Sequence, residues 1–159
     1  LAARLANGAE TIAERYVAAL RADGRFPGVH ALPAVQLRDH VTPFVGLIAS
    51  QLMIIGETRG KAPELLADGA QLRRVMSELH GAQRHRLGWS EADIERENPL
   101  MAAEIERALE GALTGGADPS SDAARAALEY AIVSVRQMLE QQSRTAIRSH
   151  RFTKATSTP

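Results

Sequence analysis

Residues 120–150 of this chain, SSDAARAALEYAIVSVRQMLEQQSRTAIRSH, decide its fold class. Their apolar positions alternate in steps of four and three residues, which is the spacing of a helix face that packs against other helices. These positions are Leu128, Ile132, Val135 and Leu139, continued by Gln142 and Ala146. The pattern predicts one long helix of about 45 Å, ending near His150.

The rest of the sequence shows the same helical period, and we find no strand pattern. Aromatic residues make up only 4% of the chain and Ala is frequent, which favours helices over sheet. Further helices are predicted at about Leu1 or Gly8 to Ala22, Ala34 to His40, Thr42 to Ile55, Gly69 to Leu87 and Ser90 to Leu113. We therefore expect an all-α fold, a single bundle of five or six helices with a long C-terminal helix.

The junction around residue 90 carries the clearest helix signals. Gly88 suits the left-handed position that ends a helix. Ser90 is the expected N-cap of the next helix, and Asp93 stands in the capping-box position. Pro99 lies inside that helix, so we expect it to kink or restart there, with Asn98 as a second N-cap. The segment from Thr114 to Pro119 is predicted to be a loop.

Composition excludes several classes of protein. A chain of 159 residues suits one domain. Its 19 basic and 19 acidic side chains balance, which argues against a general nucleic-acid binder. The absence of cysteine excludes disulfides, thiolate zinc sites and cysteine catalysis. No nucleophile motif or phosphate-binding loop is present, so we expect no enzyme.

One apolar stretch could be either a membrane-spanning helix or a helix of the protein core. The run from Phe44 to Ile55 is shorter than the roughly 20 residues of a spanning helix, so we interpret it as a core helix. This helix starts at Thr42 and Pro43, which resemble an N-cap and the first helical residue. Its apolar side chains lie nearly all round, so its second face is expected to meet another helix or another subunit. The chain opens without a signal-peptide pattern, which favours a cytoplasmic location and no membrane contact.

Four polar residues are expected to meet between two neighbouring helices. His80, Gln83 and Arg84 share one side of the Gly69–Leu87 helix, level with Glu97 on the next helix. A buried Gln or Arg needs a partner, so we expect Gln83 or Arg84 to pair with Glu97, as a structural clasp or as the lining of a small ligand pocket. The same helix is expected to bury an apolar stripe made of Leu72, Val75, Met76, Leu79 and Leu87.

The five histidines raise the question of a metal or haem. A zinc site favours ligands three or four residues apart on a helix, whereas His80 and His85 are five apart, so no metal is expected. His85 is expected to face solvent, and His150 to lie in the tail. A single inward His80 in a helical bundle leaves a haem-binding sensor as an alternative, although few aromatic residues are available to wall a porphyrin.

Residues 79–105, LHGAQRHRLGWSEADIERENPLMAAEI, resemble the N-terminal sensor domain of RsbT co-antagonist proteins, which also occurs at the front of bacterial sensor histidine kinases. The matching positions are His80, Gly81, Gln83, Arg84, Gly88, Ser90, Arg96 and Glu97. The segment 37–41 resembles a second motif of that domain, so His40 is a further candidate residue of the polar cluster. The resemblance implies a cytoplasmic, globin-like but haem-free input domain over residues 1–150. Residues 151–159 would be a polar tail leading to a kinase or STAS output domain.

These observations predict a non-catalytic input domain of a bacterial signalling protein, with a signal relayed through the C-terminal helix. We expect it to form a homodimer through the second face of the Thr42–Ile55 helix and through a C-terminal seam made of Leu128, Ile132, Val135 and Leu139. Two alternatives stay open: a haem sensor that uses His80, and a structural dimerisation bundle without a ligand.

Overall fold

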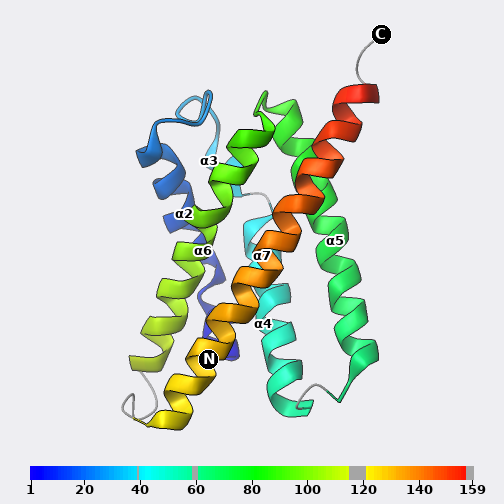
Figure 1. Cartoon of the computed structure of the whole chain (residues 1–159). Helices are drawn as coiled ribbons and strands as arrows, with labels where there is room; N and C mark the ends of the chain where they lie inside the picture. The colour runs from blue at the N-terminus through cyan, green and yellow to red at the C-terminus, as the bar shows by residue number, and fades with distance from the viewer. Residues whose placement is uncertain (39, 59–60, 115–120, 157–159) are drawn as a thin grey trace.

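The computed structural model describes residues 1–38, 40–58, 61–114 and 121–156. These residues form helices and no strand, which confirms the predicted all-α bundle with a long C-terminal helix (Figure 1). The helices are α1 (Ala2–Asn7), α2 (Ala9–Asp23), α3 (Ala34–Arg38), α4 (Val41–Thr58), α5 (Pro63–Arg86), α6 (Glu91–Thr114) and α7 (Asp122–Thr156). Residues 115–119 of the predicted loop lie outside the described residues.

Helix α7 crosses the whole height of the bundle and packs along α5 and α6 (Figure 1). The core lies between α7 and the helices α2, α4 and α6. Its fully buried large side chains include Tyr16, Leu20, Phe44, Ile48, Ile105, Leu109 and Leu139. Length and hydropathy alone would allow the segment Ala34–Thr58 to cross a membrane, which is weak evidence because the core helix of a soluble protein passes the same test.

The α5–α6 junction has the predicted caps. Gly88 has a φ of 78°, the left-handed conformation that Gly adopts without strain. The backbone N–H of Ser90 donates to Asp93 Oδ2 at 2.8 Å, and the N–H of Asp93 donates back to Ser90 Oγ at 3.2 Å. This reciprocal pair is a capping box, and it fixes the direction in which α6 leaves α5.

The starts of α4 and α5 and the course of α6 differ from the prediction. Helix α5 begins at Pro63 instead of Gly69, because Pro is well accommodated in the first turn of a helix. Helix α4 begins at Val41, which places Pro43 inside its first turn instead of at its first residue. Helix α6 continues through Pro99 without restarting at Asn98, since the buried face of Ile94, Met101 and Ile105 holds both halves against the core.

The C-terminal helix is longer than predicted and includes His150. Helix α7 continues to Thr156, so residues 151–156 of the predicted polar tail are helical. His150 is buried, with Nε2 at 2.7 Å from the carbonyl oxygen of Trp89. Its ring lies edge-on to that of His85 at 4.9 Å, so the prediction that His85 faces open solvent and His150 lies in a tail is wrong. These contacts anchor the last turns of α7 to the α5–α6 junction.

Helix α5 shows the largest departure from the sequence prediction, because its faces are reversed. Leu72, Val75 and Leu79 of the predicted apolar stripe are exposed. The buried face is mostly polar and consists of Arg73, Ser77, His80, Gly81, Gln83 and Arg84. Polar side chains can be buried here because the neighbouring helices supply hydrogen-bond partners for them.

The predicted C-terminal dimer seam packs inside the chain itself. Val135 and Leu139 are fully buried in the core, and Leu128 and Ile132 are partly buried against it. Val135 and Leu139 are therefore used by the core of the chain itself, whereas Leu128 and Ile132 are only partly covered, and a homodimer through this stripe stays a prediction. A helix this central uses its apolar stripe for its own bundle.

Candidate functional site

Arg84 is the centre of a buried polar cluster, which we call the Arg84 cluster and which comprises Tyr16, His80, Gln83, Arg84 and Glu97. The guanidinium donates from Nη2 to Glu97 Oε1 at 2.6 Å and from Nε to Glu97 Oε2 at 3.1 Å. Its Cζ also lies 4.6 Å from the centre of the Trp89 ring. Both Arg84 and Glu97 are fully buried or nearly so, which makes this a desolvated, two-pronged ion pair between α5 and α6.

The C-terminal end of α3 is tied to the same guanidinium. Arg84 Nη2 donates to the carbonyl of Leu37 at 2.9 Å, and Gln83 Nε2 donates to the carbonyl of Gln36 at 3.0 Å. Arg84 Nη1 also donates to Gln83 Oε1 at 3.1 Å. Carbonyl groups at the end of a helix lack intrahelical partners, and a cation there is favourable. One side chain of α5 therefore holds α3 and α6 together.

Tyr16 and His80 complete the ring of donors around Glu97. The Tyr16 hydroxyl of α2 donates to Glu97 Oε1, and His80 Nε2 lies 3.0 Å from Glu97 Oε2. Burial lowers the pKa of His80 well below its usual value, and the charges of Arg84 and His40 lower it further. His80 is thus neutral at pH 7, and Nε2–H donates to the carboxylate.

Glu97 is subject to two opposing influences. Burial raises the pKa of its carboxyl group well above the usual value. The Arg84 guanidinium opposes that shift, since a protonated Glu97 would leave a buried positive charge without a counter-ion. The three donors around the carboxylate stabilise the same charged form.

The structure gathers all the predicted site residues in one place. His80, Gln83, Arg84 and Glu97 are in direct contact, and the His40 ring lies 6.3 Å from the His80 ring. Sequence reasoning missed Tyr16. Its residue type could have indicated the contact, because a tyrosine buried in a core needs a hydrogen-bond partner for its hydroxyl.

The Arg84 cluster is closed to ligands. The space beside His80, Glu97 and Gln142 is about 10 Å³, which is room for one water molecule at most. A porphyrin does not fit there, and His80 Nε2 is already engaged by Glu97, so these residues do not match a haem site. Among the described residues, no three His, Asp or Glu side chains come together as a metal site. The geometry is that of a clasp that fixes the helix pairing.

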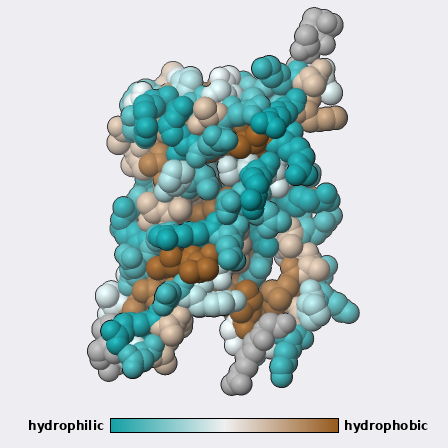
Figure 2. Space-filling view, in the orientation of Figure 1, coloured by the Kyte–Doolittle hydropathy of each residue, from teal (hydrophilic) through white to brown (hydrophobic). Residues whose placement is uncertain are grey.

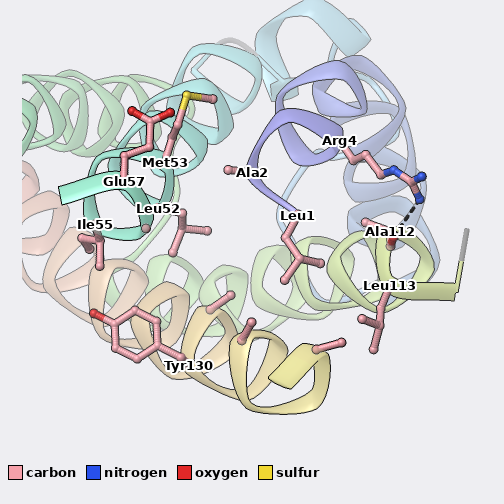
Figure 3. Close-up of a pocket in the computed structure, with 14 residues that line it drawn as sticks. Leu1, Ala2, Arg4, Leu52, Met53, Ile55, Glu57, Ala112, Leu113 and Tyr130 are labelled. Atoms are coloured by element: carbon pink, nitrogen blue, oxygen red, sulfur yellow. Dashed lines mark hydrogen bonds between the residues drawn. The ribbon is translucent and has the colours of Figure 1, made fainter. Parts of the chain in front are cut away.

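A separate cavity lies at the other end of the bundle, between α1, α4, α6 and α7. Its volume is about 730 Å³, within the range of small-molecule sites. Figure 3 shows Leu1, Leu52 and Tyr130 around the open space, with Arg4 at one side, where its guanidinium donates to the carbonyl of Ala112 at 2.7 Å. In the space-filling view, hydrophobic surface gathers on both sides of the lower half of α7 (Figure 2).

Sequence reasoning missed this cavity, although part of its signal is visible. Helix α4 is apolar nearly all round, and Leu52 and Ile55 of this helix line the cavity. The facing stretch of α7 offers the small side chains Ala124, Ala127 and Ala131. Apolar walls opposite alanines leave space unfilled. Comparisons with protein-family models, with curated proteins and with solved structures found no match for this chain.

Proposed function

We propose that this chain is a non-catalytic input domain of a bacterial signalling protein, which senses a small apolar effector and relays its binding through α7. The observation that carries the proposal is that α7 lines the 730 Å³ cavity near its start and continues as one helix to Thr156 at the opposite end of the molecule (Figure 1). A helix of 35 residues spans about 52 Å.

Helix α7 is packed tightly near its C-terminal end and borders open space near its start. This uneven packing would allow the helix to shift as a rigid unit when an effector binds. Near Ala146 the backbone of α7 lies directly against that of α5, because Gly81 has no side chain to separate them. Near Ala127 it borders the cavity. An effector that fills the cavity in only one position of α7 would shift the population towards that position, and the far end would move with it.

The lining indicates the chemistry of the effector. Leu1, Leu52 and Leu113 form apolar walls, and the polar residues in the lining are Arg4, Glu57 and Tyr130. Such a site favours a mainly apolar molecule with one neutral polar group. The resemblance to input domains of RsbT co-antagonists and sensor kinases supports a cytoplasmic location and a kinase or STAS output domain after α7.

Binding can be tested with the neutral, apolar fluorescent probe N-phenyl-1-naphthylamine, followed by fluorescence and by thermal unfolding. We expect enhanced fluorescence and a higher melting temperature, because a ligand that binds only the native state stabilises it. Ala127→Trp fills the cavity and should abolish both effects. Ala126→Trp is the matched control, since Ala126 is exposed on the same helix and does not line the cavity.

The outcomes separate the proposal from its rival. Probe binding that survives Ala127→Trp would show that the cavity is not the site. A native domain that binds no apolar probe would favour a structural bundle without a ligand. Near-ultraviolet circular dichroism of each variant shows whether tertiary packing is retained, so that dye binding to a loosened state is recognised.

A further inference from the structure

The exposed face of α5 carries an apolar stripe with a charge at each end. We call it the α5 surface, and it comprises Asp68, Leu72, Val75, Leu79, Ala82 and Arg86. Leu72, Val75 and Leu79 are 55%, 42% and 49% exposed, and Ala82 is half-buried. Helix α5 lies at one edge of the bundle and packs on α4 and α7, which leaves this surface facing outward (Figure 1).

The spacing of the α5 surface is that of a helix–helix seam. Successive members alternate between steps of four and three residues, as the a and d positions of a heptad do. The bundle itself does not use this seam, because α5 buries its opposite, polar face. A large apolar stripe left open on a folded domain marks an interaction surface.

The order of residues along the seam matches a reversed copy of itself. The pattern is symmetric about position 77, so an antiparallel copy would place Val75 opposite Leu79 and Leu72 opposite Ala82. Such a contact is isologous, since each residue meets its counterpart twice across a two-fold axis. The contact therefore forms a closed dimer and cannot add further copies.

The charges distinguish the antiparallel from the parallel orientation. In the antiparallel register Asp68 of one copy lies opposite Arg86 of the other, at both ends of the seam. A parallel pairing would instead put Asp68 against Asp68 and Arg86 against Arg86. Opposite charges at the flanks of an apolar seam select the orientation of the helices, whereas like charges oppose it.

We propose that a second copy of this chain docks on the α5 surface, with the two α5 helices antiparallel and Asp68 paired with Arg86 across each end. The partner is thus a second copy of the chain, because the apolar residues and the charges of the α5 surface are complementary to those of a reversed copy. The proposal does not depend on the cavity or on a signal carried by α7.

Sedimentation velocity over a range of protein concentrations tests the interface by charge exchange. We expect the wild-type chain to dimerise, and Asp68→Arg or Arg86→Asp alone to raise the dissociation constant at least about tenfold, because each creates two like-charge contacts. The double variant Asp68→Arg/Arg86→Asp should restore dimerisation. Val133→Glu is the control, because Val133 is exposed on α7 outside the α5 surface and should leave the dimer unchanged.

Introduced cysteines test the register directly, since the chain has none of its own. Leu72→Cys/Ala82→Cys should form a disulfide-linked dimer under mild oxidation. Leu72→Cys alone should not, because the two positions would lie about 15 Å apart along antiparallel helices. A monomeric wild type at high micromolar concentration, a double charge variant that fails to regain dimerisation, or efficient cross-linking by Leu72→Cys alone would overturn the proposal.

Discussion

Gly81 of α5 lies against the backbone of Ala146 of α7, so closely that a Cβ on Gly81 would overlap the Ala146 carbonyl group. The obstruction is backbone, which cannot rotate away as a flexible side chain would. Ala146 is itself fully buried, so the two helices meet there through their smallest residues. This contact lets α5 bring its polar face close enough to share hydrogen bonds with the rest of the bundle.

Gly81→Ala should therefore destabilise the fold, although alanine is the better helix former. We expect a loss of about 3 kcal/mol in the free energy of unfolding, since α7 must shift to make room for the methyl group. Denaturant unfolding followed by circular dichroism measures it. Gly111→Ala on α6 is the matched control, because a Cβ there meets nothing, and it should stabilise by about 0.5–1 kcal/mol. Equal effects of the two substitutions would contradict the close contact.

Glu97→Gln should be among the most damaging substitutions in the chain. It leaves the buried Arg84 guanidinium without its counter-ion, at a cost of about 3–5 kcal/mol in the free energy of unfolding. Glu106→Gln is the control, because Glu106 binds Arg136 in an ion pair whose arginine is 64% exposed, and its loss should cost no more than about 1 kcal/mol. An unchanged denaturant midpoint for Glu97→Gln would show that the ion pair does not hold α5 to α6.

The sequence predicted the helices, the capping box at Ser90 and a pairing of Gln83 or Arg84 with Glu97, which Arg84 makes, because each depends on neighbours in the chain or on one adjacent helix. The prediction of the buried face was wrong for α5, because it relied on an apolar stripe at helical spacing to mark that face. That rule assumes that polar side chains stay in water. Here Tyr16 and Glu97 come from other helices to satisfy them, and no local pattern contains those partners.

The C-terminal stripe of α7 leaves a related question open. Heptad spacing at Val135 and Leu139 indicates that α7 packs on other helices, but it does not say whether they belong to the same chain. The same ambiguity hid the cavity, since an apolar α4 facing alanines of α7 can be either tightly packed or hollow. Only the spatial arrangement of the helices decides between these outcomes.

Tyr16→Phe isolates the hydrogen bond that the sequence did not reveal. The ring stays in the core and only the hydroxyl that donates to Glu97 is lost. We expect a loss of about 1.5–3 kcal/mol, because the acceptor is a buried charged group. Tyr130→Phe, on the exposed side of α7, should change the stability little. A Tyr16→Phe protein as stable as the wild type would mean that Glu97 is fully satisfied without the phenol.

His80 should make the stability of the domain depend on pH below neutrality. Burial, followed by the charges of Arg84 and His40, holds its folded-state pKa well below the unfolded value of about 6.5. Between these two values the unfolded chain binds more protons than the folded one, so stability rises with pH and is lost as pH falls from 7 to 5. Glu97 also faces His80, and a raised pKa at Glu97 would act in the opposite direction.

The contribution of His80 therefore has to be measured as a difference. His80→Gln retains an N–H donor for Glu97 but cannot titrate, so its unfolding free energy should fall less between pH 7 and pH 5 than that of the wild type. The difference should approach about 1.4 kcal/mol for each pH unit below 6.5. His30→Gln, in an exposed turn, should follow the wild-type profile. If His80→Gln and the wild type lose stability in parallel, His80 is protonated as easily in the folded bundle as in the unfolded chain. That result would contradict the conclusion that His80 is a neutral donor to Glu97.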